Sequence, residues 1–184
     1  DFPITSDEQS EKFAADLLSR YSPSVVIAIE RCGMTAQGTF HNMHGKDISA
    51  YNARTDFLFT QHDRTVGVGD GGNEIGMGNH ADVVAATESL VGRPCVTKTS
   101  ELVIASTSNW GGYGLVAALS ERSGKNVLAS VEHEKEILDS FVEAGLVDGM
   151  TQDNVPMVDG FSHEENSAIV QRLHGYLQAK MARN

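Results

Sequence analysis

The densest group of chemically useful side chains lies in a glycine-rich run from residue 67 to residue 78. Six of its twelve residues are glycine, and Asp70, Asn73 and Glu74 are the polar side chains among them. Glycine lets a backbone approach a ligand closely, and carboxylate and amide oxygens suit Mg²⁺ or Ca²⁺ or an ammonium group. A turn whose Asp70 and Asn73 merely cap a helix is the structural alternative. We favour a functional interpretation because functional residues concentrate in loops.

The glycine spacing argues against a nucleotide cofactor. No Gly-Lys-Ser/Thr sequence closes the run, which excludes a Walker A loop. Gly67, Gly69 and Gly72 do satisfy a GxGxxG spacing, but the first two fall inside a predicted strand. The cofactor that these residues allow is a divalent cation, Mg or Ca, with Asp70 and Glu74 as its metal ligands.

Two other polar segments also follow apolar runs. Glu30-Arg31 could be a base beside an arginine that clamps a carboxylate, or a plain internal ion pair. The segment 108–112 offers hydroxyl, amide and backbone N–H groups at the start of a helix, which suits a carboxylate ligand. Its alternative is a simple N-cap, with Trp110 as a core aromatic.

Helices and strands alternate along the chain. Apolar, β-branched runs predict strands over 24–29, 65–69 and 101–106, a short edge strand at Val96, and a short strand or turn over 146–150. Apolar periodicity and capping residues predict helices over 6–21, 47–61, 82–90, 113–123, 131–144 and 162–182.

This alternation predicts a single α/β domain over residues 1–184, with a layered, mostly parallel sheet flanked by helices, Rossmann-like in kind. Ligands of open α/β sheets bind at the carboxyl ends of the strands. We therefore expect the loops at Glu30-Arg31, 70–78 and 106–112 to converge on one site.

Composition excludes several classes of function. The 184 residues carry a net charge of −11, which argues against a nucleic-acid partner and against an anionic membrane surface. No apolar run is long enough for a membrane span. Cys32 and Cys95 form no CxxC pair, which fits a reduced compartment. No secretory signal is visible, so the expected location is cytoplasmic.

Five motifs together resemble the C-terminal domain of the D-glutamate cyclase family, in an order and spacing that extend over nearly the whole chain. They are Ile29-Glu-Arg-Cys-Gly33, Asn42-Met-His-Gly-Lys-Asp47, Gly69-Asp-Gly-Gly-Asn-Glu-Ile-Gly-Met-Gly78, Ser108-Asn-Trp-Gly-Gly-Tyr113, and Val147-Asp-Gly-Met150 followed by Val158-Asp-Gly160. The family usually has proline where Cys32 stands. The family domain also begins further upstream, so the chain resembles the C-terminal part of a longer domain.

The resemblance implies a lyase that condenses D-glutamate intramolecularly to 5-oxo-D-proline and water, located in the mitochondrial matrix if the source is eukaryotic. From residue chemistry we expect Glu30 or Glu74 to be the base, and Asp70 with Asn73 to hold the ammonium or a cation. Glu30, Asp70 and Glu74 are thus the expected catalytic residues. The expected substrate-binding residues are Arg31, Gly71, Gly72, Asn73, Ser108, Asn109, Trp110 and Gly111.

Two other classes of function use the same loops. One is a metal-dependent hydrolase or lyase that acts on another small amino acid or carboxylate. The other is a non-catalytic module that binds such a ligand. In each case the partner is a small amino acid or carboxylate, and homo-oligomerisation is left open.

Overall fold

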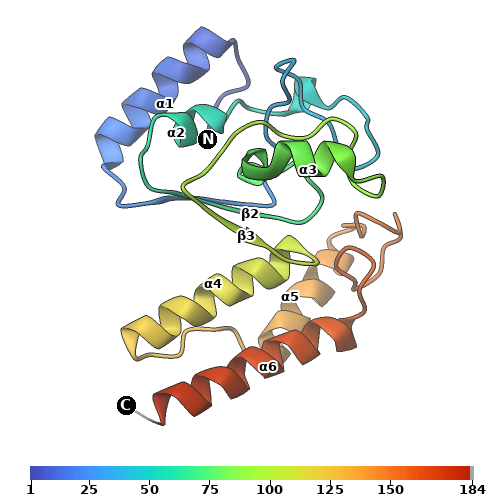
Figure 1. The fold of residues 1–184 in the computed structure, drawn as a ribbon. Helices are drawn as coiled ribbons and strands as arrows, with labels where there is room; N and C mark the ends of the chain where they lie inside the picture. Colours follow the sequence, from blue (N-terminus) through green and yellow to red (C-terminus); the bar gives the residue numbers. More distant parts are fainter. Residues whose placement is uncertain (183–184) are drawn as a thin grey trace. The chain divides into compact units, whose positions relative to one another are not determined.

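The computed structural model describes residues 1–182, which divide into two compact units: residues 1–108, and residues from 109 onward (Figure 1). The first unit contains a parallel sheet and three α-helices, and the second contains the last three α-helices. The predicted α/β fold with a parallel sheet is therefore confirmed, and each unit is described below by itself.

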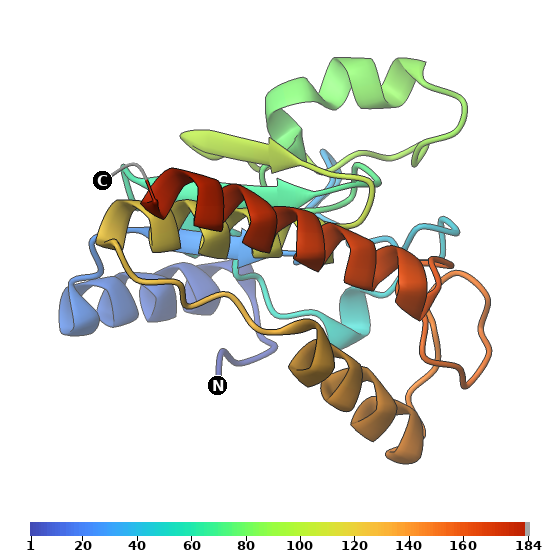
Figure 2. The same cartoon turned by 90° about the horizontal axis from the view of Figure 1, so that it is seen from below.

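The sheet of the first unit has three strands in the order β1-β2-β3. They are β1 (Val26–Ile29), β2 (Thr65–Gly69) and β3 (Glu101–Ile104), and both neighbouring pairs are parallel. Figure 2 shows the three strands side by side. All three lie within the predicted runs. Because the strands are parallel, the loops that follow them leave the sheet at the same edge.

Three helices lie over one face of this sheet: α1 (Asp7–Tyr21), α2 (Asp56–Thr60) and α3 (Ala81–Ala86) (Figure 1). The Ser6 side chain caps α1 by accepting a hydrogen bond from the backbone N–H of Gln9. Phe59 of α2 packs with Ala28 of β1 and with Ile75. Short 3₁₀ turns, η1 (Ser49–Tyr51) and η2 (Met77–His80), complete the unit.

Three predicted elements of this unit differ in the structure. The helix expected over 47–61 is broken, because Asn52 is extended (φ −115°, ψ 125°) and the carbonyl of Ala53 accepts a hydrogen bond from Arg31. Helix α3 ends at Ala86, short of the expected residue 90. Val96 forms no strand, since its N–H donates to the carbonyl of Met34 in a loop.

The second unit consists of α4 (Ser108–Ser123), which starts at the last residue of the first unit, α5 (Val131–Glu143) and α6 (His163–Met181). Its core is formed by Ala117, Leu128, Val170 and Leu177. Helix α6 begins with a capping box formed by Ser162 and Glu165.

One prediction for this part of the chain is wrong. Residues 108–112 are helical, although a loop was expected there. Of the short strand or turn predicted over 146–150, the structure has the turn, in which the Asp148 carboxylate accepts backbone N–H groups of Met150, Thr151 and Gly160. Among the described residues, no helix combines the length and the apolar character needed to cross a membrane.

Candidate active site at the carboxyl ends of the strands

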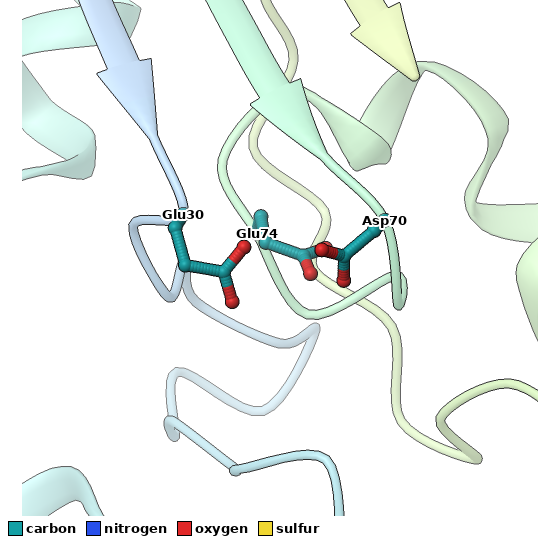
Figure 3. Close-up of side chains that lie close together, drawn as sticks. All are labelled: Glu30, Asp70 and Glu74. Atoms are coloured by element: carbon teal, nitrogen blue, oxygen red, sulfur yellow. The ribbon is translucent and has the colours of Figure 1, made fainter. Parts of the chain in front are cut away.

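Three carboxylates meet where β1 and β2 end (Figure 3). Glu30 directly follows β1, Asp70 directly follows β2, and Glu74 lies further along the glycine-rich run; one oxygen of each lies within 4.8 Å of the others. The structure thus brings together the three side chains that the sequence suggested as catalytic. Glu30 joins Asp70 and Glu74 as a third oxygen donor that could hold a metal ion, a role that sequence analysis had not given it.

Backbone pairing holds the loop after β1 against the glycine-rich run. Cys32 and Glu74 form an isolated antiparallel bridge, flanked by hydrogen bonds of 2.8 Å from Gly33 N to Asn73 O and from Ile75 N to Arg31 O. Glu30 itself adopts a left-handed backbone conformation with φ of 54°. Such a conformation is costly for a residue with a side chain and concentrates at functional sites.

Glu74 is the buried member of the cluster, with 1% of its surface exposed. Its carboxylate accepts the backbone N–H groups of Gly71 at 2.9 Å and of Gly72 at 2.8 Å. Burial raises the pKa of Glu74, the Gly71 hydrogen bond opposes this, and the negative charge of Asp70 raises the pKa further. A carboxylate that protonates more readily than usual is suited to taking up and returning a proton.

Asp70 connects the cluster to the segment that follows β3. Its Oδ2 accepts the backbone N–H of Ser108 at 2.8 Å, so Ser108 lies beside the acidic cluster as predicted. The Ser108 hydroxyl is buried and has no hydrogen-bond partner. Asn109, Trp110 and Gly111 belong to the second unit, where the Trp110 indole donates to the Asn166 side chain at 2.6 Å.

Two predicted substrate-binding side chains are engaged with the protein. The Asn73 amide nitrogen donates to the carbonyl of His41 at 3.0 Å, whereas its Oδ1 is buried without a hydrogen-bond partner and can still accept one. The Arg31 guanidinium donates from Nε to Thr55 at 3.0 Å and from Nη2 to the Ala53 carbonyl at 2.8 Å. A two-pronged clamp of Arg31 on a carboxylate would have to compete with these bonds.

The glycines of the run serve close packing as well as the site. Gly71 and Gly72 are among the predicted substrate-binding residues, and in the structure their N–H groups donate to the Glu74 carboxylate. Gly76 has φ of 103°, and a Cβ there would lie 2.8 Å from the α-carbon of Gly67 in β2. Part of the glycine content therefore reflects two backbone segments in contact, a requirement that sequence alone does not separate from ligand binding.

The acidic cluster fits a positively charged ligand. Three carboxylates confined to this space repel one another unless a proton, an ammonium group or a metal ion compensates them. All the donor atoms are hard oxygens, which suits Mg²⁺ or Ca²⁺. The bonds to Gly71, Gly72 and Ser108 occupy one lone pair on each of three oxygens, and a carboxylate oxygen has two.

Open α/β sheets generally bind their ligands at the carboxyl ends of the strands, which is where this acidic cluster lies. The chain belongs to the D-glutamate cyclase-like, C-terminal family, whose profile matches residues 2–174. It is 37% identical over 109 residues to the human protein named D-glutamate cyclase, mitochondrial. That alignment covers 51% of this chain and 16% of the human protein, so the chain spans a small part of that relative.

Proposed function

We propose that this chain carries the active site of a lyase that cyclises D-glutamate to 5-oxo-D-proline with loss of water. The observation that supports this most directly is the acidic cluster of Glu30, Asp70 and Glu74, in which one oxygen of each residue lies within 4.8 Å of the others. It offers both a charge partner for an ammonium group and a proton acceptor. The family to which the chain belongs supplies the substrate class.

The reaction needs proton transfers and no redox step. The α-ammonium of D-glutamate loses a proton, and the resulting amine attacks the γ-carboxylate carbon to form the C–N bond of a five-membered ring. One carboxylate oxygen then leaves as water, carrying the two protons that the nitrogen gave up. Ring closure within one molecule benefits from proximity. The protein must therefore mainly hold the substrate in a bent conformation and transfer protons.

The residues divide these tasks by their environments. Asp70, with the amide oxygen of Asn73, holds the ammonium group. Glu74, whose pKa is raised by burial, accepts the proton and returns it to the leaving oxygen. Glu30 is more exposed than Glu74 and is the other candidate base. A divalent cation bound by these carboxylates would polarise the γ-carboxylate.

The remaining partners follow from this assignment. The ligand is a small anionic amino acid, and the net charge of −11 disfavours a nucleic-acid partner. The human relative is named as a mitochondrial protein. We propose that this chain is located in the mitochondrial matrix if its source is eukaryotic, and in the cytoplasm otherwise.

The test is conversion of D-glutamate to 5-oxoproline by the purified chain, with L-glutamate and with EDTA as parallel arms. We expect the D-isomer to be converted, with Glu30→Gln and Glu74→Gln both impaired. Glu101→Gln is the matched control, because Glu101 is exposed at the opposite end of the sheet, where β3 begins. Absence of conversion by a folded chain would overturn the proposal. Conversion of a different amino acid would favour the hydrolase or lyase alternative.

A further inference from the structure

An anionic substrate presents the acidic cluster with an electrostatic problem. D-glutamate carries two carboxylates beside its single ammonium group, and a site formed by Glu30, Asp70 and Glu74 repels both of them. The whole chain is also strongly acidic, with a net charge of −11. A carboxylate of the substrate therefore needs a cationic group outside the cluster and close to it.

Two arginines of the first unit, Arg31 and Arg54, already have partners. Arg31 donates to Thr55 and Ala53, and Arg54 forms an ion pair of 2.7 Å with Asp7. Arg93 differs from them. Its side chain is exposed and takes part in no hydrogen bond or ion pair within the part of the chain that the structure describes.

Arg93 lines a pocket of about 460 Å³ whose walls are both attached to the glycine-rich run. One wall, residues 41–45, is held where the Asn73 amide donates to the His41 carbonyl at 3.0 Å. The other wall, residues 90–93, is held where the N–H of Val91 donates to the Gly71 carbonyl at 3.4 Å. The pocket also contains His44, a second side chain that can donate to a carboxylate.

One glycine separates this pocket from the buried carboxylate. Met43 lines the pocket and packs against Gly71 so closely that a Cβ there would overlap its sulfur. The same Cβ would lie 3.4 Å from Oε1 of Glu74. The pocket and the acidic cluster are therefore neighbours across Gly71, with positive charge on one side and negative charge on the other.

We propose that the pocket lined by Arg93 and His44 binds a carboxylate of the amino-acid substrate while its ammonium group lies at the acidic cluster. The inference rests on the proposed function, which supplies the dicarboxylic ligand. Arg93 presents a planar set of donors that matches a carboxylate. Asp47 is the acidic side chain on which the Arg93 charge also acts, and a bound carboxylate would compete with it.

The experiment measures D-glutamate and glutarate binding by calorimetry, and turnover in parallel, for the whole chain and three variants. Arg93→Gln should weaken binding of both ligands at least about tenfold and raise KM, with kcat nearly unchanged, because the contact is made in ground and transition states alike. Arg93→Lys should restore part of the affinity. Arg64→Gln removes an equal charge at the start of β2, remote from the pocket, and should change nothing.

The outcomes separate this inference from the proposed function. Arg93-dependent binding without any turnover would overturn the cyclase and support the carboxylate pocket. Turnover with an unchanged KM in Arg93→Gln would overturn the pocket and leave the cyclase standing. Failure of the parent chain to bind either dicarboxylate, or an equal loss in Arg64→Gln, would also overturn the pocket. Thermal unfolding of each variant verifies that the exposed substitutions leave the fold intact.

Discussion

The backbone of Cys32 pairs with that of Glu74 in an isolated antiparallel bridge. This pairing fixes the loop after β1 against the glycine-rich run and brings Glu30 to the carboxylate of Glu74. Because the bridge is made by backbone atoms, the side chain at position 32 is not what holds the two loops together. Burial raises the pKa of the Cys32 thiol to about 11, so this side chain is a poor nucleophile at neutral pH.

The two glutamates should respond differently to amide substitution. Glu30→Gln should lower kcat by about 10²-fold or more if Glu30 moves a proton, while the free energy of unfolding stays within about 0.5 kcal/mol because the residue is exposed. Glu74→Gln should lose turnover and also about 1–3 kcal/mol of stability, since its amide N–H would face the N–H donors of Gly71 or Gly72. Chemical denaturation alongside kinetics distinguishes the two. Equal stability losses would contradict the hydrogen-bonding argument.

A divalent cation at the acidic cluster should stabilise the fold. We expect millimolar Mg²⁺ or Ca²⁺ to raise the thermal midpoint of the parent chain, and EDTA to reverse the change, since a ligand present at 100 times its Kd adds about 2.7 kcal/mol. Asp70→Asn should abolish the shift, whereas Glu101→Gln should keep it. A midpoint that is insensitive to both ions, or a shift that survives in Asp70→Asn, would argue for an ammonium site alone.

Asp56 is buried and Asp47 is exposed, and their ionisation should change the stability of the fold with pH in opposite directions. Burial raises the pKa of Asp56 in the folded state, so ionisation destabilises the fold as pH rises through the carboxyl range. Asp56→Asn keeps the Oδ1 acceptor for the N–H of Met34 but removes the charge. The variant should therefore gain stability relative to the parent as pH rises, by about 1.4 kcal/mol for each unit by which the folded pKa of Asp56 exceeds its unfolded pKa.

Asp47 provides the matched control for this measurement. Hydrogen bonds from Ser49 lower the pKa of Asp47, so its contribution is present above the unfolded pKa and is lost as pH falls. Asp47→Asn should thus lose stability relative to the parent as pH rises. Denaturation midpoints between pH 3 and pH 8 test both signs, and parallel curves for the two variants would refute the assignment.

Much of the fold followed from local patterns. The three strands are β-branched apolar runs, and α1 and α6 begin at the serine caps Ser6 and Ser162, where the predicted helices start. The failures occurred where distant groups decide the backbone. The carbonyl of Ala53 is taken by Arg31, which breaks the expected helix over 47–61. Residues 108–112, with two glycines, lack a helical signature, yet they start α4, where Ser108 N binds Asp70.

The sequence could predict that the three acidic side chains lie together, but it could not predict where the arginines of this region lie. Asp70 and Glu74 stand in a glycine-rich run after a strand, and Glu30 ends another strand, so parallel pairing alone places them at one edge. Arg31 follows Glu30 in sequence, but its guanidinium contacts Thr55. Arg93 lies in an irregular segment without periodicity, and its place beside the run depends on the bond from Val91 to Gly71. No local pattern contains that information.

The glycine-rich run should tolerate a methyl group only where a flexible side chain can move. Gly76→Ala should destabilise the fold by about 3 kcal/mol or more, because φ is 103° and the obstructing atom is the backbone of β2. Gly71→Ala meets the Met43 side chain instead, so adding Met43→Ala should recover part of its smaller loss. Gly114→Ala, which faces open space within α4, should gain about 0.5–1 kcal/mol and serves as the control. Urea denaturation measures the stability of all four variants. A Gly76→Ala chain as stable as the parent would refute the close contact between Gly76 and Gly67 of β2.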